Sequence, residues 1–526
     1  MDSKRVKLVE KEDRISSLPD SIIQHILSFL PSTKHAIRTS ALSKRWEKQW
    51  TRVPVLILDF SGMCSTVSDE EFSRTSSDVA RFIDNILILH DCLKIKKFHL
   101  KSGHDFGQDP NCNAKLRFAL RKEVEELSLH ILSCGRIYEL FKLPNFFFNH
   151  ASFLKLKVIN CSLMPVGRVN WDCLKDLHIE ECILANHAIE SVISGSPLLE
   201  SLEINYCAEF EFDRLVIASK SLKRLVLVDF CQEFVVLEVL CPNLEEFHAV
   251  SRAVYPCTLS DAALETLLSG SPLLEVLELV DCYDITQLVI DSKSLKKLVL
   301  VGFRTDAIVI SCPNLEELNL NSMSTSIIKL MNLSSTICVT LDLTNLARMI
   351  LEQLHHVKEL NIGHGCIQIL SALEMRSLSS PSVNCKSLTV DGGPKFAKHL
   401  PGIAYVLRNS PELERLVVNL RHVECDVCER LPDLNFYRGN YWNSNETVSN
   451  CLVSHLKIVK IISLSKEDGK LNLMFNFVEF LLKNAQILEK MVIILADGGA
   501  DFELEVSKKL LSFSRLSQHA VVELLP

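Results

Sequence analysis

From about residue 90 onward, aliphatic residues return in the pattern L-x-x-L-x-L. The L-x-L part alternates apolar and polar positions with a period of two, which predicts a short β-strand with one buried face. One such strand buries too little apolar surface to be stable alone, so successive copies must stack and share a core. The clearest copies begin, 20 to 30 residues apart, at Leu174, Leu199, Leu222, Leu244, Leu274, Leu295 and Leu315.

This spacing is typical of leucine-rich repeats and predicts an α/β fold, a curved solenoid with a mixed outer layer. Weaker copies begin at Ile95, Val124, Phe153, Val357, Cys385 and Leu413, and residues 320–356 fit the pattern poorly. A unit of three coils is duplicated, because 194–204, 219–227 and 241–247 match 269–279, 292–300 and 312–318. In the outer layer the pattern predicts helices at 188–194 and 262–269, and strands at 215–217, 288–290 and 308–310.

The first fifty residues have a different, helical periodicity. Apolar residues recur at helix spacing between Leu18 and Leu30, Pro31 ends that helix, and a second amphipathic stretch carries Trp46 and Trp50. About 40 residues cannot bury a core of their own. The segment must therefore either pack on the rest of the chain or present apolar surface to another protein, and periodicity alone does not choose between the two.

Three short stretches in this segment, 13–20, 26–31 and 38–46, resemble the F-box of plant proteins. In that family the Leu-Pro pair, the aliphatic positions of the next helix and the Leu-Ser-x-x-Trp stretch dock on a Skp-type adaptor, which binds a cullin. The resemblance therefore implies adaptor contacts from Leu18, Pro19, Ile23, Ile26, Leu27, Leu30, Pro31, Leu42, Ser43 and Trp46. His35 stands where relatives often carry an acidic residue.

The repeat pattern fades after Leu413, and the chain resembles the FBD domain that follows the repeats in many plant F-box proteins. The residues that carry this resemblance lie at 456–461, 480–485 and 488–493. We expect strands at 451–461 and 488–494 and a helix at 475–482, which would cap the open end of the solenoid. The predicted domains are a charged tail (1–12), the F-box (13–60), regular repeats (90–320), irregular repeats (321–430) and the FBD domain (448–526).

The resemblance implies a non-catalytic substrate receptor of an SCF-type ubiquitin ligase, which binds an unknown protein target. We expect the target to contact the concave strand face, because concave solenoid surfaces usually carry the binding site. The side chains between the inward leucines there include Asp176, His178, Glu203, Arg224, Val226, Glu246, His248, Glu278, Lys297 and Val299. Two alternatives stay open: an F-box scaffold without a ligase role, and a receptor that completes its pocket with a small ligand.

The composition indicates which kinds of partner and cofactor to expect. The net charge of −8 gives no sign of nucleic-acid binding, no stretch is apolar enough to span a membrane, and 19 unpatterned cysteines predict reduced thiols in the nucleus or cytoplasm. Cysteines at equivalent turn positions of the repeats form a ladder, which does not make a tetrahedral metal site. Zinc-like spacing occurs at His422, Cys425, Cys428, Cys451 and His455, but coincidence is easy with so many cysteines, and we predict no metal and no cofactor.

Overall fold

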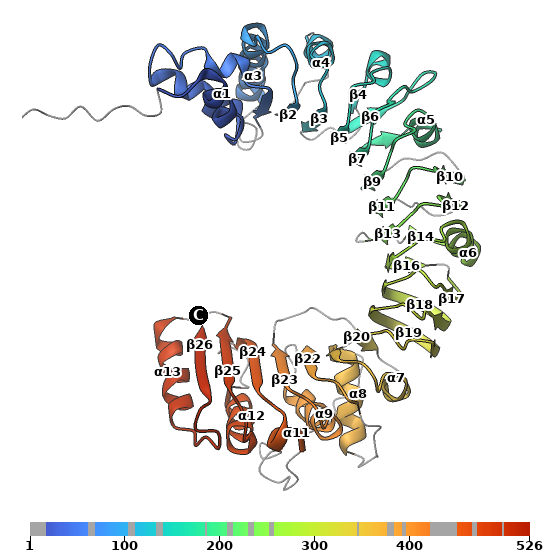
Figure 1. The fold of residues 1–526 in the computed structure, drawn as a ribbon, viewed down its shortest axis with the longest axis vertical. Coiled ribbons are helices and arrows are strands. Elements are labelled where there is room, and N and C mark those ends of the chain that lie inside the picture. Colours follow the sequence, from blue (N-terminus) through green and yellow to red (C-terminus); the bar gives the residue numbers. More distant parts are fainter. Residues whose placement is uncertain are drawn as a thin grey trace, which may run out of the picture. The chain divides into compact units, whose positions relative to one another are not determined.

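The computed structural model describes residues 17–60, 69–103, 111–132, 140–184, 187–207, 214–229, 236–251, 257–283, 285–343, 347–375, 383–391, 396–420, 450–464, 471–496 and 499–525. These residues form two compact units, Met1–Asn243 and Leu244–Pro526. Each unit is built around its own stack of parallel strands (Figure 1).

The first unit begins with a helical segment, residues 17–60, which we call the F-box segment. Its elements are α1 (Asp20–Ser28), α2 (Thr33–Arg38), the 3-10 helices η1 (Thr39–Ala41) and η2 (Gln49–Arg52), and β1 (Val55–Asp59). The hydroxyl of Thr33, at the start of α2, accepts a hydrogen bond from the Ile57 amide in β1 (2.8 Å). Because β1 pairs in parallel with the first repeat strand, β2, the helical segment joins the repeats directly.

The repeats of the first unit contribute parallel strands in continuous register after β1. In order across the sheet these strands are β2 (Lys97–Gly103), β3 (Glu126–Leu132), β5 (Lys155–Ile159), β7 (Asp176–Glu180), β9 (Ser201–Asn205) and β11 (Arg224–Val228). Their inward residues, such as Leu177, Leu202 and Leu225, are fully buried. The predicted repeat of L-x-L strands with an inward leucine face is therefore confirmed in this unit.

The other side of these strands carries a mixed layer (Figure 1). Its helices are α3 (Asp69–Leu89), α4 (Cys112–Arg121), η4 (Asn145–Phe148) and α5 (Ala188–Ser194). Its short strands are β4 (Phe141–Lys142), β6 (Cys161–Leu163), β8 (Ile183–Leu184), β10 (Arg214–Ala218) and β12 (Val236–Leu240). The helix expected at 188–194 and the strand expected at 215–217 are both present.

The second unit continues the same construction with more strands. In order they are β13 (Glu246–Val250), β15 (Val276–Val280), β18 (Lys297–Ser311), β19 (Glu317–Met331), β20 (Cys338–Leu343), β21 (Glu359–Ile362), β22 (Ser387–Asp391), β23 (Arg415–Asn419), β24 (Ile458–Leu464), β25 (Lys490–Leu495) and β26 (Val521–Leu525). All are parallel. The inward residues Leu277, Leu298 and Leu318 are buried as expected.

The outer layer of the second unit begins with strands and ends with helices (Figure 1). It contains β14 (Cys257–Thr258), α6 (Asp261–Gly270), β16 (Cys282–Tyr283), β17 (Gln287–Asp291), α7 (Ala347–Gln353), α8 (His364–Met375), α9 (Phe396–Asn409), α11 (Asn450–Ser454), α12 (Leu471–Asn484) and α13 (Ala500–Leu511). The helix expected at 262–269 lies within α6, and the strand expected at 288–290 lies within β17. The expected helix at 475–482 lies within α12.

A long strand, β19, explains why the first part of residues 320–356 fits the repeat pattern poorly, because it continues to Met331. β18 and β19 are each 15 residues long and pair along their whole length, with a register shift beside Gly302. Gly302 has φ +76°, and a Cβ there would lie 1.8 Å from the Oδ1 of Asp281. Only glycine satisfies both conditions without strain. The predicted strand at 308–310 is the outer part of β18.

The prediction of a strand at 451–461 is wrong in its first part. Cys451 and Leu452 lie in helix α11, where the Cys451 carbonyl accepts the amide of His455 (2.9 Å), and the strand begins only at Ile458. Periodicity could not separate these two elements, because a short apolar run fits either a buried helix turn or a strand.

Candidate functional site

Helix α1 of the F-box segment has two apolar faces. Ile23 and Leu27 point inward and are 0% and 3% exposed. Ile22, Ile26 and Phe29 point outward and are 44%, 42% and 75% exposed. Residues at i, i+4 and i+7 share one helix face, so the outward three form a single apolar stripe. A helix that needed only to pack against its own chain would not require the second stripe.

A further exposed leucine follows α2 and η1. Leu42 is 69% exposed. Ile22, Ile26, Phe29 and Leu42 are the large exposed apolar side chains of the described F-box segment, and we call these four residues the outer F-box face. Pro19 and Pro31, which flank α1, are also exposed.

The structure divides the ten predicted adaptor contacts into three groups. Pro19, Ile26, Pro31, Leu42 and Ser43 are exposed, whereas Leu18 and Leu30 are half-buried. The side chains of Ile23, Leu27 and Trp46 lie in the interior, as does that of Trp50. We therefore assign these three predicted contacts to the core that supports the outer F-box face, since a buried side chain cannot touch a partner directly.

Polar contacts hold this segment in one arrangement. The guanidinium of Arg45 donates to the carboxylate of Asp20 (Nη2 to Oδ1, 2.7 Å) and to the backbone carbonyl of Leu18. Gln49 accepts a hydrogen bond from Gln24 (3.1 Å). The hydrogen bond from Arg45 lowers the pKa of Asp20 below its ordinary value. These contacts join the start of α1 to residues 45–49, so the outward stripe has a fixed orientation.

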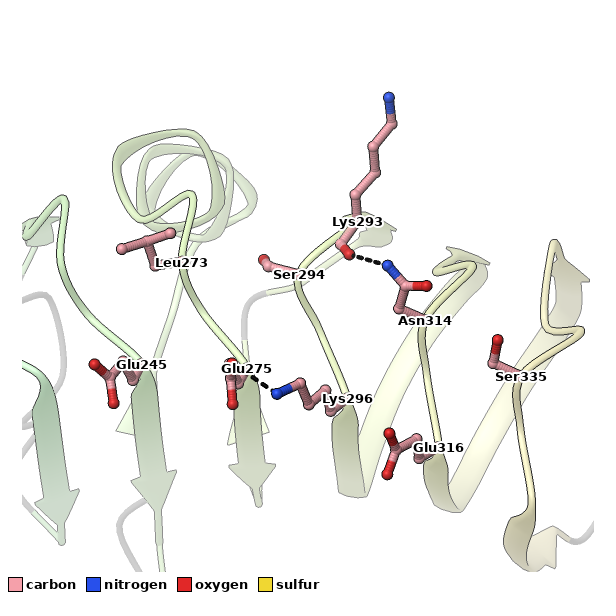
Figure 2. A pocket seen from close by; sticks show the side chains of 9 residues that line it. All are labelled: Glu245, Leu273, Glu275, Lys293, Ser294, Lys296, Asn314, Glu316 and Ser335. Carbon is pink, nitrogen blue, oxygen red and sulfur yellow. Dashed lines mark hydrogen bonds and ion pairs between the residues drawn. The ribbon is translucent and has the colours of Figure 1, made fainter.

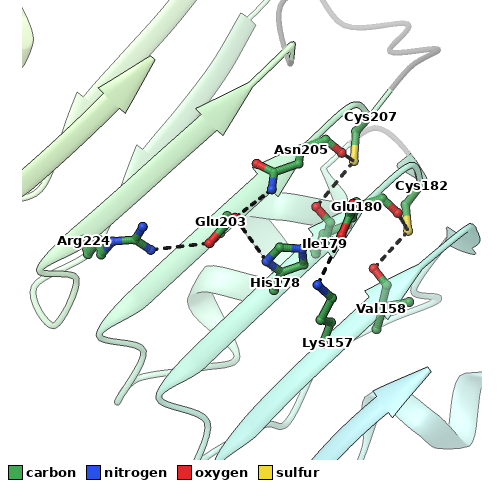
Figure 3. A network of polar contacts seen from close by, with 10 residues as sticks. All are labelled: Lys157, Val158, His178, Ile179, Glu180, Cys182, Glu203, Asn205, Cys207 and Arg224. Carbon is green, nitrogen blue, oxygen red and sulfur yellow. Dashed lines mark hydrogen bonds and ion pairs between the residues drawn. The ribbon is translucent and has the colours of Figure 1, made fainter. Parts of the chain in front are cut away.

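The predicted substrate-contact residues of the first unit share a network of charges on the outward face of β7, β9 and β11 (Figure 3). His178 lies between two carboxylates, 2.9 Å from Glu180 Oε2 and 3.3 Å from Glu203 Oε1. Lys157 pairs with Glu180 (3.3 Å) and Arg224 with Glu203 (3.5 Å). The network therefore links strands β5, β7, β9 and β11 across their register.

Electrostatics in this network favour the ionised carboxylates. Partial burial alone would raise the pKa of Glu180, but hydrogen bonds from His178 and Lys157 outweigh it and hold that pKa below its ordinary value. The same balance holds for Glu203, where burial is outweighed by the hydrogen bond from Asn205 and by nearby positive charge, so its pKa is also lowered. These charges already satisfy one another and are poorly suited to act alone on a ligand.

Of the other predicted residues in this unit, Asp176 takes the corresponding outward position at the start of β7 and is half-buried. Val226 is a correction, because only 7% of its surface is exposed although its position alternates outward. Its register partner is Glu203, so the charged network lies directly beside it.

In the second unit, the predicted residues gather on β13, β15 and β18. His248, Glu278 and Val299 are in register, and His248 Nδ1 lies 2.7 Å from Glu278 Oε2. Glu246 is 3.6 Å from the other ring nitrogen of His248. Lys297 pairs with Glu317 of the next strand (2.9 Å).

Half-buried valines surround these pairs and are the apolar part of this face, namely Val250, Val276, Val280, Val299 and Val301. The predicted valine, Val299, is therefore one member of a cluster of half-buried valines on this face.

A pocket of about 460 Å³ lies where the chain enters β13, β15, β18 and β19 (Figure 2). Its lining is Glu245, Leu273, Glu275, Lys293, Ser294, Lys296, Asn314, Glu316 and Ser335. Lys296 is paired with Glu275 (2.8 Å), and the side chain of Lys293 points away from the others. Three glutamates and one apolar residue do not make the basic pocket that a polyanionic cofactor needs, nor the apolar one that small ligands use.

The cysteines of the repeats are structural. Cys182 donates to the Glu180 carbonyl (3.2 Å), and Cys207 donates to that of Asn205 (3.4 Å) (Figure 3). Burial raises the pKa of Cys182 to about 12, and the pKa values of Cys161 and Cys207 are also raised by burial. A raised pKa disfavours the thiolate, which is the form of cysteine that binds metals and attacks as a nucleophile.

The zinc-like cluster is only partly visible. His422, Cys425 and Cys428 lie outside the described residues, whereas Cys451 is buried and its Sγ donates to the Leu407 carbonyl (3.2 Å). Within the part of the chain that the structure describes, no group of three or more His, Cys, Asp or Glu residues could hold a metal ion. Among those same residues, no helix combines the length and apolar character needed to cross a lipid bilayer.

Sequence reasoning missed several residues at both surfaces. Ile22 and Phe29 were not selected, although the i, i+4, i+7 spacing around Ile26 was a usable signal for them. Lys157 was missed because its charge pair with Glu180 joins neighbouring repeats and is visible only when the strands are placed in register.

Comparisons with known proteins cover most of the chain. A family model described as "FBD-associated F-box protein At5g56370, LRR repeats" matches residues 113–258 and 253–418. An F-box domain model matches residues 15–58, and an FBD model matches 444–493.

Two relatives from Arabidopsis thaliana show the same similarity. The F-box/LRR-repeat protein At5g02910 is 29% identical over 495 residues, which is 93% of this chain and 90% of the relative. F-box/LRR-repeat protein 25 is 33% identical over 214 residues, or 40% of this chain and 73% of the relative. With an F-box at its start, leucine-rich repeats in its middle and an FBD region near its end, this chain belongs to the F-box/LRR-repeat protein family.

Proposed function

We propose that this chain is the substrate receptor of an SCF-type ubiquitin ligase, as its family indicates in general. In this proposal the outer F-box face binds a Skp-type adaptor, the adaptor binds a cullin, and the outward strand faces of the repeats bind the protein to be ubiquitinated. The chain itself carries out no bond chemistry.

The observation that carries the proposal is the exposed apolar stripe of α1 together with Leu42. Four large apolar side chains on one small helical segment, each more than two-fifths exposed, cost free energy in water. Burial against a partner removes that cost. The internal core of Ile23, Leu27 and Trp46 supports the proposal further, because it leaves the outer stripe free for another protein.

Proximity is the mechanism that follows. A receptor that holds its target beside a ubiquitin-charged enzyme raises the effective concentration of the target's lysine at the thioester. The receptor needs two binding surfaces and a fixed connection between them. The parallel pairing of β1 with β2 provides such a connection within the first unit.

The strand faces favour a protein target over a small molecule. Their charges are mostly paired in networks such as His178–Glu180–Glu203, and between them lie half-buried valines. Such a surface can bury apolar residues of a folded partner while its charged groups fix the orientation.

The test compares tagged wild-type chain with Phe29→Asp/Leu42→Asp in plant cells in which the ligase is inhibited. Because the two aspartates place charge in the proposed contact, we expect the variant to lose adaptor and cullin while keeping the proteins bound by the repeats. Leu198→Asp is the matched control, since Leu198 is 51% exposed and lies outside the F-box segment.

The alternative of an F-box scaffold without a ligase role predicts a different result: wild-type chain would bring down the adaptor but no cullin. If Phe29→Asp/Leu42→Asp retained the adaptor at the wild-type level, the proposed docking surface would be wrong.

A further inference from the structure

A set of hydrogen-bond donors crosses strands β2, β3 and β5, which are neighbours in the sheet of the first unit (Figure 1). His99, Ser128 and Lys157 are in register on these three strands. Lys101 and His130 are in register two residues further along β2 and β3. All five side chains are half-buried on the outward face of the strands. We call these five residues the donor patch, because lysine, serine and histidine side chains can each donate a hydrogen bond to an anion.

Most of the donor patch has no acceptor of its own. Within the described residues, the side chains of His99, Lys101, Ser128 and His130 form no hydrogen bond or ion pair. Lys157 is different, since its Nζ lies 3.3 Å from Glu180 Oε2 (Figure 3). The charged network of β7 and β9 therefore uses only one member of the donor patch.

The charges around the donor patch favour an anion. Outward positions of β2 and β5 carry four lysines, and those of β1 and β3 carry two carboxylates, namely Lys97, Lys101, Lys155, Lys157, Asp59 and Glu126. Glu126 is in register between Lys97 and Lys155, so it offsets only part of their charge. The whole chain carries a net charge of −8, so this local excess of positive charge is not a general property of its surface.

The two histidines of the donor patch respond to this positive charge. Burial lowers the pKa of His99, and Lys97, Lys101 and Lys157 lower it further, while Asp59 acts in the opposite direction. Burial also lowers the pKa of His130. Lys101, His99 and Lys157 add to that effect, and Glu180 opposes it. Because Lys101 and Lys157 act on both histidines, their positive charge reaches the whole patch.

We propose that the donor patch binds the phosphate of a phosphorylated serine or threonine on the protein that the repeats hold. This inference rests on the proposed function and names the class of its target. A phosphate ester carries a charge of about −1.5 to −2 and three strong acceptor oxygens. A carboxylate has less charge and fewer oxygens, so it would satisfy fewer of these donors.

Ser128 determines where the phosphate would lie. It is the smallest side chain in its row, which runs Ile57, His99, Ser128, Lys157, His178, Glu203 and Val226. His99 and Lys157 stand on the strands to either side, about 10 Å apart at the backbone. A phosphate above Ser128 would therefore have a donor below it and donors on both sides.

A nucleic acid fits this face less well. Beyond the donor patch, the outward positions of β7 and β9 carry the carboxylates Asp176, Glu180 and Glu203. Nucleic-acid binding usually needs a continuous basic stripe, because successive phosphates must each be neutralised. A single phosphorylated side chain meets the lysines without passing those carboxylates.

The test measures fluorescence anisotropy of labelled short peptide libraries mixed with the purified full-length chain. The libraries are identical mixtures except at their central residue, which is phosphoserine, serine or aspartate. We expect the wild type to bind the phosphoserine library at least about tenfold more tightly than either of the others. Lys101→Glu should abolish this preference, and so should Ser128→Glu, because each places a carboxylate in the donor patch.

Lys220→Glu is the matched control, since it makes the same change of charge at an exposed lysine of the first unit outside the donor patch. It should keep the preference. Urea unfolding checks that each variant is folded, and if one of the two patch variants unfolds, the other still tests the site.

The proposal is overturned if the wild type binds the serine or the aspartate library as tightly as the phosphoserine library. It is also overturned if Lys220→Glu loses the preference as fully as Lys101→Glu, or if a labelled single-stranded RNA binds as tightly as the phosphoserine library. None of these measurements involves the adaptor. A failure here therefore leaves the ligase role to be judged by Phe29→Asp/Leu42→Asp.

Discussion

The division of the F-box segment into an outer face and a core makes a quantitative prediction. Truncating the two most exposed side chains, in Phe29→Ala/Leu42→Ala, should weaken adaptor binding without changing the fold. Full burial of a leucine or phenylalanine side chain contributes about 1.5–3 kcal/mol. Since these two are 75% and 69% exposed before binding, each contributes about 1–2 kcal/mol to the complex, and the dissociation constant should rise about 30- to 700-fold.

Trp46→Ala, by contrast, should lower the stability of the fold. Its side chain is 4% exposed, so its removal leaves a cavity in the F-box segment and lowers the free energy of unfolding by about 3–5 kcal/mol. The exposed pair should change that free energy by less than about 0.5 kcal/mol. Isothermal titration with purified adaptor measures the dissociation constant, and urea unfolding measures the free energy of unfolding.

Leu198→Ala is the control for the titration, because it removes an exposed leucine elsewhere in the first unit. The reasoning fails if Phe29→Ala/Leu42→Ala binds the adaptor as tightly as the control does. It also fails if that variant unfolds as easily as Trp46→Ala, since the two side chains would then belong to the core.

Three further predictions concern stability, each checked by urea unfolding. Burial raises the pKa of Asp342, whose carboxylate accepts the Gly365 amide at the start of α8 (2.7 Å). The wild type should therefore lose stability relative to Asp342→Asn as pH rises through that raised pKa. A pH-independent difference in stability between the two proteins would contradict this. The pKa of Glu203 is lowered, so the contribution of its carboxylate to stability is present above the ordinary carboxyl pKa and is lost as pH falls through the lowered pKa. Glu203→Gln should therefore lower the free energy of unfolding by about 0.5–1 kcal/mol at neutral pH and by little in acid. Gly302→Ala should cost at least about 1–2 kcal/mol from its left-handed backbone, and adding Asp281→Ala should recover only the steric part; full recovery would show that backbone strain is absent.

The repeats were predictable because their physics is local. An inward leucine such as Leu225 follows from period-two alternation, and Leu298 follows from the duplicated coil that contains it. The turn cysteines, among them Cys182, follow from the same register. Each of these features depends on a pattern that recurs in every coil, so the sequence states it several times.

Features that depend on one particular packing were not predictable. Both faces of α1 are apolar, so periodicity placed Ile23 and Ile26 in one stripe although one is buried and the other exposed. Val226 alternates outward, yet its neighbours cover it. The long strands β18 and β19 replace a turn with continuous pairing, which only Gly302 signals.

In the receptor role that we propose, the direct pairing of β1 with β2 would help to decide which lysines of a target are modified. Because paired strands join the F-box segment to the first repeats, a receptor of this kind would hold its target at a set distance from the ligase. A target bound by the first unit would present only those lysines that lie within reach of the ubiquitin-loaded enzyme at this distance. A protein whose lysines all fall beyond that reach would be captured and yet escape degradation.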